Sequence, residues 1–292
     1  MAQLIARAAA RLERAGVFFG HGTDNARDEA AVLVLHAAGL SWRQATSLGR
    51  RRVGRAAQRR LQQLLQRRIH ERIPAAYLTG VAWFAGLSLK VDARVLIPRS
   101  PLAEIIERRF APWVEAARVR RVLDIGTGSG CIAIACARYL PAARIDAIDV
   151  SEAALEVARV NVRRHRLGAR VRLRTSDHFD ALVHATYDII VANPPYVGSA
   201  ELERLPAEYR HEPRVALAAG RAGLDSVRVI VREAARHLRA RGLLIVEVGN
   251  SERAVRREWP RLPFVWLQFA RGGGGVFVLT REQLLASRRP GG

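Results

Sequence analysis

The stretch Val122-Leu123-Asp124-Ile125-Gly126-Thr127-Gly128-Ser129-Gly130 is an apolar strand that runs directly into a glycine-rich turn. The apolar helical sequence CIAIACARYL follows at residues 131–140. Glycines let the backbone turn tightly and approach a ligand closely. The turn also leaves free N–H groups at a helix N-terminus, which favour a carboxylate or a phosphate. This order of strand, turn and helix predicts a cofactor site in an α/β domain.

The surrounding sequence has the pattern of a doubly wound α/β sheet. From about residue 119 onward, short apolar strands alternate with helical stretches. The expected strands are RVLDIG, RIDAIDV, RVRLRTSD, YDIIVANPP and LLIVEVG. Near the C-terminus, FVWLQF and VFVLT flank Arg271 and the run Gly272 to Gly275, which predicts a terminal antiparallel hairpin on an otherwise parallel sheet.

Acidic residues close the two strands that follow the glycine turn. Asp149 ends IDAIDV, about twenty residues beyond Gly130, where a carboxylate can accept both ribose hydroxyls of an adenosine. Asp177 ends the third strand and could accept from an adenine amino group. Any one of these acids could be a helix cap or a surface carboxylate. Three acids at successive strand ends predict a single crevice at the carboxyl edge of the sheet.

The fourth strand ends in Asn193-Pro194-Pro195-Tyr196. An amide or aromatic amine nitrogen has a delocalised lone pair, so it must be positioned and polarised before it can react. The Asn193 side-chain carbonyl and the Pro194 carbonyl could each accept one N–H of such a group. Pro195 has a fixed φ and no N–H, which keeps the loop stiff, and Tyr196 could pack flat against a planar target. These four residues are the predicted catalytic residues, and the alternative of a plain turn is disfavoured by the acids upstream.

The chain divides into three expected parts. Residues 1–74 read as a helical domain for substrate recognition, because apolar positions recur at helical spacing and Ile73-Pro74 ends the last helix. Residues 75–100 contain aromatic and β-branched residues broken by Gly80 and Gly86, which predicts a β-hairpin linker. Residues 101–292 form the domain with the cofactor site.

The net charge of +21 permits two interpretations. A basic surface attracts polyanions, so ribosomal RNA or a ribosome precursor could be a partner. Alternatively, a GC-rich genome enriches arginine throughout, since Lys90 is the sole lysine. The densest basic cluster could equally be a solvated helix face with a loop before it; it comprises Arg50, Arg51, Arg52, Arg55, Arg59 and Arg60.

Neither a metal nor a membrane is expected. Cys131 and Cys136 lie five residues apart in an apolar helical stretch, which suits small core residues better than a zinc site or a disulfide. No apolar run reaches the roughly 18 residues of a membrane-spanning helix. The N-terminal sequence lacks the features of a secretory signal, so we expect a cytoplasmic location.

The run from Val122 to Gly130 resembles the first motif of Rossmann-like class I methyltransferases. The resemblance implies S-adenosyl-L-methionine as cofactor and S-adenosyl-L-homocysteine as product. It places Asp124 at the methionine amino end, the turn of Gly126, Thr127, Gly128 and Gly130 along the cofactor backbone, and Asp149 on the ribose. Asp177, His178 and Asn193 complete the expected cofactor residues.

Over nearly its full length, the chain resembles the protein-glutamine methyltransferase family. The resemblance rests on the helical domain, RIPAAYLTG and the following linker, Asn-Pro-Pro-Tyr, EYRHEP at 208–213, EVGNSE at 247–252 and the final hairpin. Phe19 to Asn25, Trp83-Phe84 and Pro98 to Pro101 resemble the branch that modifies the large-subunit ribosomal protein L-three. The expected reaction is therefore methylation of a glutamine side-chain amide in that protein, assisting ribosome assembly.

Three alternatives remain open at this point. The sister branch methylates peptide-chain release factors, but it usually has an acidic sequence after the arginine corresponding to Arg99 and often a tryptophan where this chain has His178. The Asn-Pro-Pro-Tyr motif also occurs in adenine amino methyltransferases of nucleic acid, although this chain has no large additional base-recognition domain. A non-catalytic ribosome assembly factor is the fourth interpretation, and it would have no need of the cofactor acids.

Overall fold

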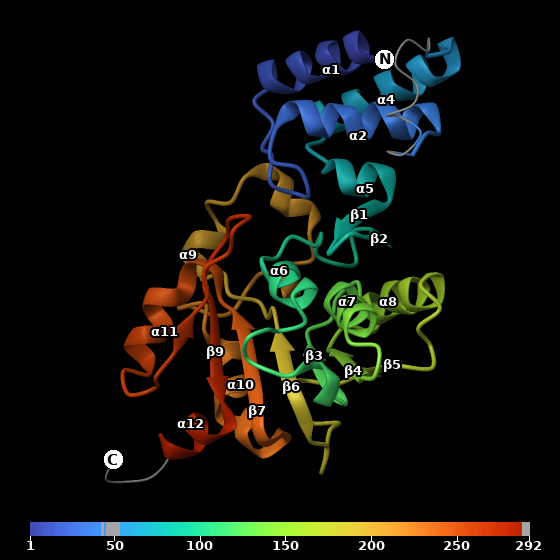
Figure 1. Ribbon diagram of the computed structural model, residues 1–292. Helices are drawn as coiled ribbons and strands as arrows, with labels where there is room; N and C mark the ends of the chain where they lie inside the picture. Colours follow the sequence, from blue (N-terminus) through green and yellow to red (C-terminus); the bar gives the residue numbers. More distant parts are fainter. Residues whose placement is uncertain (42–43, 45–52, 288–292) are drawn as a thin grey trace.

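The computed structural model describes residues 1–41, 44 and 53–287. Helices form the N-terminal part, and an α/β domain forms the rest (Figure 1). The helices of the N-terminal part are α1 (Ala2–Arg14), α2 (Ala26–Ala38), α4 (Arg55–His70) and α5 (Ala75–Thr79). Their apolar faces share one small core, in which Leu12, Leu33 and Leu61 are at most 1% exposed. Alanine and leucine at helical spacing produce this core.

The linker holds the predicted hairpin, which is formed by β1 (Val81–Phe84) and β2 (Leu87–Lys90). The strands are antiparallel, with Phe84 opposite Leu87. Ala85 and Gly86 both have positive φ, as a two-residue hairpin turn of this kind requires. The short helix α5 precedes the hairpin within residues 75–100, a feature that the β-rich pattern of the linker did not predict.

The α/β domain is built on a seven-stranded sheet of order β5-β4-β3-β6-β7-β9-β8. Strands β3 to β7 run parallel, and β9 pairs antiparallel with both β7 and β8. This confirms the predicted doubly wound sheet with a terminal antiparallel hairpin. The strands are β3 (Arg121–Ile125), β4 (Arg144–Asp149), β5 (Val171–Thr175), β6 (Tyr187–Ala192), β7 (Leu238–Glu247), β8 (Val265–Trp266) and β9 (Val276–Thr280).

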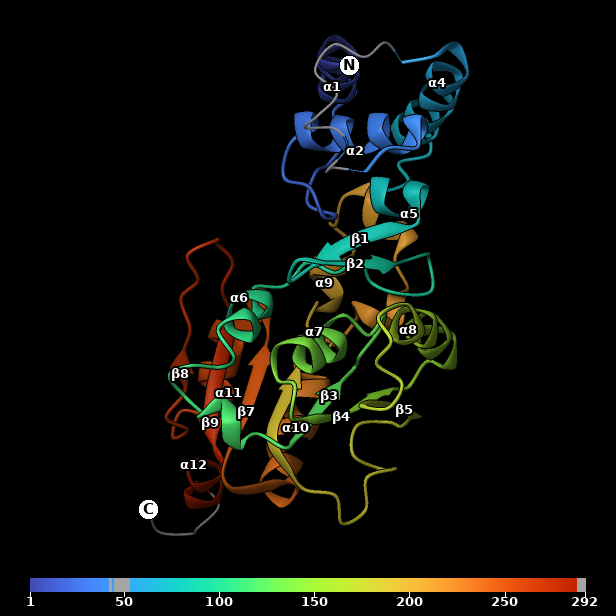
Figure 2. The same ribbon diagram turned by 45° about the vertical axis from the view of Figure 1, so that its right-hand side comes forward.

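Helices cover both faces of the sheet (Figure 2). One face carries α6 (Leu102–Glu107), α7 (Cys131–Tyr139) and α8 (Glu152–Arg164). The other carries α10 (Asp225–His237), α11 (Glu252–Glu258) and α12 (Arg281–Ala286). On α7, Cys136 is buried and Cys131 is partly buried. Such a sandwich leaves the carboxyl ends of the parallel strands at one edge, where ligands bind in folds of this kind.

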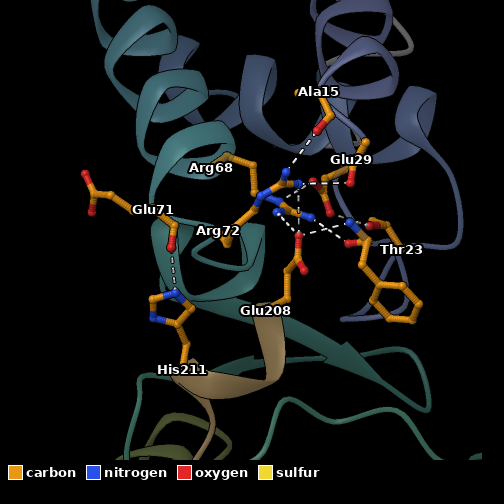
Figure 3. A network of polar contacts seen from close by, with 10 residues as sticks. Ala15, Thr23, Glu29, Arg68, Glu71, Arg72, Glu208 and His211 are labelled. Atoms are coloured by element: carbon orange, nitrogen blue, oxygen red, sulfur yellow. Dashed lines mark hydrogen bonds and ion pairs between the residues drawn. The ribbon is translucent and has the colours of Figure 1, made fainter. Parts of the chain in front are cut away.

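Short irregular pieces complete the domain. They are η1 (Ala116–Arg118), α9 (Ser199–Leu202), η2 (Ala207–His211), η3 (Arg214–Ala216) and η4 (Gly249–Ser251). The chain from η2 to Gly220, which we call the bridging segment (residues 207–220), leaves the α/β domain and contacts the helical part. Figure 3 shows Glu208 and His211 of this segment reaching toward α4.

A buried ion network joins the helical part to the bridging segment. The Arg68 guanidinium on α4 donates to Glu29 Oε1 at 2.7 Å, to Glu208 Oε1 at 2.9 Å and to the Phe18 carbonyl at 2.6 Å. The backbone N–H of Phe18 also donates to Glu208. Arg68, Glu29 and Glu208 are each at most 2% exposed, so their charges are withdrawn from water and depend on one another.

Three expectations from the sequence concern the basic cluster, membrane helices and metal sites. Arg50, Arg51 and Arg52 lie outside the described residues, while Arg55 and Arg59 lie exposed on α4. Within the described ranges, no helix is both long and apolar enough to cross a membrane. The same residues contain no group of three or more histidines, cysteines or carboxylates arranged to hold a metal ion.

Replacing Arg68 with methionine should destabilise the protein by roughly 3–5 kcal/mol, because Glu29 and Glu208 would be left buried without a cation. The matched control is Arg67→Met, one residue earlier on α4, whose ion pair with Glu71 is half exposed. That change should cost less than about 1 kcal/mol. Urea denaturation followed by circular dichroism measures both, and equal midpoints for the two variants would contradict the role given to Arg68.

Candidate active site

A cavity of about 280 Å³ lies at the carboxyl edge of the sheet, beside the ends of β3, β4 and β6. The structure brings most of the predicted site residues together around it. The predicted residues on its wall are Gly126, Gly128, Asp149, Asp177, His178, Asn193, Pro194 and Pro195. Asp124, Thr127, Gly130 and Tyr196 lie behind this wall, and their contacts suit supporting positions.

Asp124 supports the glycine turn from inside the domain. Its carboxylate is fully buried, and Oδ2 accepts the Thr127 hydroxyl at 2.6 Å and the Ala133 backbone N–H at 3.0 Å. These bonds close the turn and hold the start of α7. The other oxygen, Oδ1, is buried and has no hydrogen-bond partner among the residues that the structure describes. An unpaired buried acceptor at this point fits a ligand that brings a donor such as an ammonium group.

Gly130 determines how closely two helices pack. It has a φ of 81° at the start of α7, and a Cβ there would lie 3.3 Å from the Ala158 Cβ on α8. Together with the positive φ, this leaves little room for a side chain. Gly130 therefore shapes the cavity from behind, while Gly126 and Gly128 present their backbone to it.

Asp149 lies between the glycine turn and the next helix. Its Oδ2 accepts the Gly128 N–H at 2.8 Å, and its Oδ1 accepts the Ser151 N–H at 2.9 Å. Both oxygens keep further acceptor capacity, and the residue lines the cavity. Burial raises the pKa of Asp149. The arrangement suits two neighbouring hydroxyls of a ribose.

Asp177 and His178 form one edge of the cavity. Asp177 is exposed, and its Oδ1 lies 2.6 Å from His178 Nδ1. His178 has a φ of 46°, in the left-handed region, and its carbonyl accepts the buried Ser176 hydroxyl at 2.9 Å. The Ser176 bond holds the turn that places both side chains at the rim. Either side chain could contact an adenine ring there.

The Asn193 side chain is left available for a substrate. It is partly exposed at the end of β6 and lines the cavity. Among the residues that the structure describes, none hydrogen bonds to its amide. Pro194 is buried beside it and Pro195 partly so. An amide that is free, rigidly mounted and directed at a cofactor-sized cavity can hold a second amide or amine for reaction.

Tyr196 turns away from the cavity and packs below the end of β7. Its hydroxyl donates to Glu247 Oε1 at 3.3 Å, and its carbonyl accepts the Ser251 hydroxyl at 2.9 Å. A Cβ on Gly249 would lie 2.6 Å from the ring, so a glycine is required there. These contacts anchor the catalytic loop, and contact of Tyr196 with a planar target stays a prediction.

The sequence interpretation missed two parts of the wall. Arg94, Val95 and Leu96 come from the linker, and the bridging segment contributes Pro213, Val215, Ala216 and Ala218. Val197 of the catalytic loop bonds to Leu217 and Ala219 at 2.9 and 3.0 Å, so the bridging segment lies directly beside the loop. The EYRHEP sequence was the available signal, but its contacts are too distant in sequence for local patterns to reveal them.

Known protein families match both the helical part and the α/β domain. Residues 108–207 match the methyltransferase small domain, and residues 3–80 match the PrmC N-terminal domain. A methyltransferase structure from Pyrococcus furiosus has a TM-score of 0.51 and 20% identity, covering 67% of this chain and 89% of that chain. At this identity the likeness concerns the fold.

Relatives match over almost the whole length. A protein of Xanthomonas campestris named ribosomal protein uL3 glutamine methyltransferase is 48% identical, with 97% of this chain and 92% of the relative covered. Relatives with the same name from Neisseria meningitidis serogroup A and Bordetella pertussis are each 47% identical. They cover 95% and 96% of this chain, and 92% and 95% of their own length, respectively.

Replacing Asp124 with asparagine should flatten the pH dependence of stability. Burial raises the pKa of Asp124 to about 7, so the folded protein binds a proton there that the unfolded chain releases above about pH 4. The contribution of Asp124 to the free energy of unfolding therefore falls by roughly 3 kcal/mol as pH rises from about 4 to about 7. The asparagine oxygen can still accept from Thr127 and Ala133.

Urea denaturation midpoints at several pH values in this range measure the effect. The variant should have a shallower slope than the wild type, although Asp149 and Glu247, whose pKa values are also raised by burial, keep part of the dependence. Parallel curves for the two proteins would contradict the assignment.

Proposed function

Because this chain belongs to the ribosomal protein uL3 glutamine methyltransferase family, we propose that it transfers a methyl group to a glutamine side-chain amide of uL3. The methyl donor is S-adenosyl-L-methionine, and the product is S-adenosyl-L-homocysteine. The observation that carries the proposal is identity of 47–48% over nearly the full chain to relatives of this name. The unengaged Asn193 amide beside the cofactor cavity supports it.

The residues of the cavity fit the cofactor. Asp149 offers two oxygens for the ribose. Gly126 and Gly128 have no side chains, so the cofactor can lie close to the backbone of the turn. The unpaired Asp124 Oδ1 lies behind this turn, where it favours the positive amino end of methionine. S-adenosyl-L-methionine supplies a methyl group already activated on a sulfonium, so the protein needs no covalent intermediate.

The protein's own task is then to hold the acceptor nitrogen. The Asn193 side-chain oxygen and the Pro194 carbonyl each accept one N–H of the substrate amide. Both hydrogens are thereby held, and the nitrogen lone pair faces the methyl group in line with the S–CH3 bond. The N–CH3 bond forms as the S–CH3 bond breaks, and the nitrogen releases one of its two protons to water. Pre-organisation of this kind reduces the entropy cost of the reaction, and the stiff Pro194-Pro195 pair provides it.

The helical part supplies the proposed surface for the protein substrate. The bridging segment links that part to the cavity wall through Glu208 at one end and Ala218 at the other. We propose domain limits of 1–74, 75–100 and 101–292, and a cytoplasmic location where uL3 is available. A role in ribosome assembly and a contact with ribosomal RNA stay predictions.

Asn193→Ala should lower kcat by roughly 100- to 1,000-fold, because one acceptor of the substrate N–H groups is lost. The assay is transfer of labelled methyl from S-adenosyl-L-methionine to purified uL3, with release factors, ribosomal RNA and DNA as alternative acceptors. Asn250→Ala is the matched control, since Asn250 is exposed and its side chain donates to Glu201, outside the cavity. Label on a release factor or on nucleic acid instead of uL3 would overturn the proposed substrate.

Asp149→Ala should raise the Kd for S-adenosyl-L-homocysteine by roughly 10- to 100-fold through loss of the ribose acceptor. The control is Asp146→Ala on the same strand, where the carboxylate faces Arg121 and Tyr187. Isothermal titration calorimetry measures both. Equal affinities for the two variants would show that Asp149 does not hold the cofactor.

A further inference from the structure

Glu247 is a buried carboxylate directly behind the catalytic loop. It ends β7, and it is 3% exposed. Its Oε1 accepts the Tyr196 hydroxyl at 3.3 Å, and its Oε2 accepts the Ser100 hydroxyl. One side chain therefore ties the catalytic loop to the segment that connects the linker with α6.

The hydrogen-bond partners of this carboxylate are hydroxyl groups. The nearby Arg99 guanidinium donates to both oxygens of Glu212, at 2.6 and 2.5 Å, and lies over the Tyr209 ring. Within the described part of the chain, no arginine, lysine or histidine forms an ion pair with Glu247. Burial raises the pKa of Glu247 to about 7. A buried acid without a cation costs stability, so its presence calls for another explanation.

The hydroxyl contact completes the fixing of Tyr196. The ring is confined by Gly249, and the carbonyl is held by the Ser251 hydroxyl. Those contacts act on the backbone and on the side of the ring, whereas the bond to Glu247 holds the outer end of the ring at its hydroxyl. Asn193 lies three residues earlier, and the two intervening prolines transmit the position of Tyr196 to it.

We propose that Glu247 is a positioning residue for methyl transfer, which acts through Tyr196 to aim the Asn193 amide into the cavity. The proposal rests on the proposed function of that cavity. Ser100 holds the second oxygen of Glu247 and thereby connects the linker with the catalytic loop. The role requires a hydrogen-bond acceptor at position 247 and does not require a negative charge.

Glu247→Ala should lower kcat about 100-fold, because displacement of a positioned group by about 1 Å has an effect of this size. The KM for S-adenosyl-L-methionine and the calorimetric Kd for S-adenosyl-L-homocysteine should change less than about twofold, since Asp149 and the glycine turn keep their contacts. Glu247→Gln should keep kcat within about threefold of the wild type, because its amide oxygen accepts from Tyr196 and its amide nitrogen can donate to Ser100.

A variant of Tyr196 tests whether Glu247 affects kcat through its contact with Tyr196. Tyr196→Phe should lower kcat as much as Glu247→Ala does, and the double variant should be no slower than either single variant. Such non-additivity is expected when two residues act through one contact. Effects that multiply in the double variant, or a glutamine variant as slow as the alanine variant, would overturn the positioning role.

A stability control separates positioning from general damage. Glu104 on α6 is 7% exposed, and it accepts the backbone N–H groups of Ala270 and Arg271 away from the cavity. Glu104→Ala should lower the unfolding midpoint and leave kcat within about twofold, as expected for a residue outside the site.

Different results would overturn the proposed methylation of uL3 and the positioning role of Glu247. Methylation of purified uL3 by the wild type, with an unchanged kcat in Glu247→Ala, would overturn the positioning role alone. No methylation of uL3 by the wild type would overturn the proposed function and the positioning role that rests on it.

Discussion

The Arg68 guanidinium lies between the carboxylates of Glu29 and Glu208, and the attachment of the helical part depends on this buried contact. Removing ions from water is costly, so the three groups are stable only when they are held in place together. Glu208 belongs to the bridging segment, whose other end pairs with the catalytic loop at Val197. The surface proposed for the protein substrate and the loop that carries Asn193 are thus parts of one continuous structure.

The same segment explains how the linker reaches the cavity. Glu212 accepts the Arg99 guanidinium and the Ile97 N–H, and the Arg99 hydrogen bonds contribute to a low Glu212 pKa of about 2. The next residue, Pro213, lines the cavity. Ser100 continues the connection to Glu247 and Tyr196. Both glutamates are buried, but Glu212 is paired with the Arg99 guanidinium, whereas Glu247 accepts hydroxyl groups.

The cavity combines rigid and available groups in a way that suits transfer to an amide. Asp124, Gly130 and Tyr196 are buried or packed behind the wall, where they determine the backbone of the turn and the loop. Asp149 and Asn193 face the cavity, and the Asn193 amide keeps its hydrogen-bonding capacity for a substrate. The supporting residues order the site before the substrate binds, so the reacting groups meet in a fixed geometry.

The sequence by itself determined the doubly wound sheet, the glycine turn and the position of Asn193-Pro194-Pro195 at a strand end. Those features follow from local rules, since strand periodicity, glycine at positive φ and proline stiffness act over a few residues. Only the tertiary structure decided that Asp124 is buried behind the cavity wall, that Tyr196 packs against Glu247, and that Pro213, Val215, Ala216 and Ala218 line the cavity. It also brought Arg68 to Glu208 and Glu247 to Ser100, because contacts across more than a hundred residues depend on how whole elements pack.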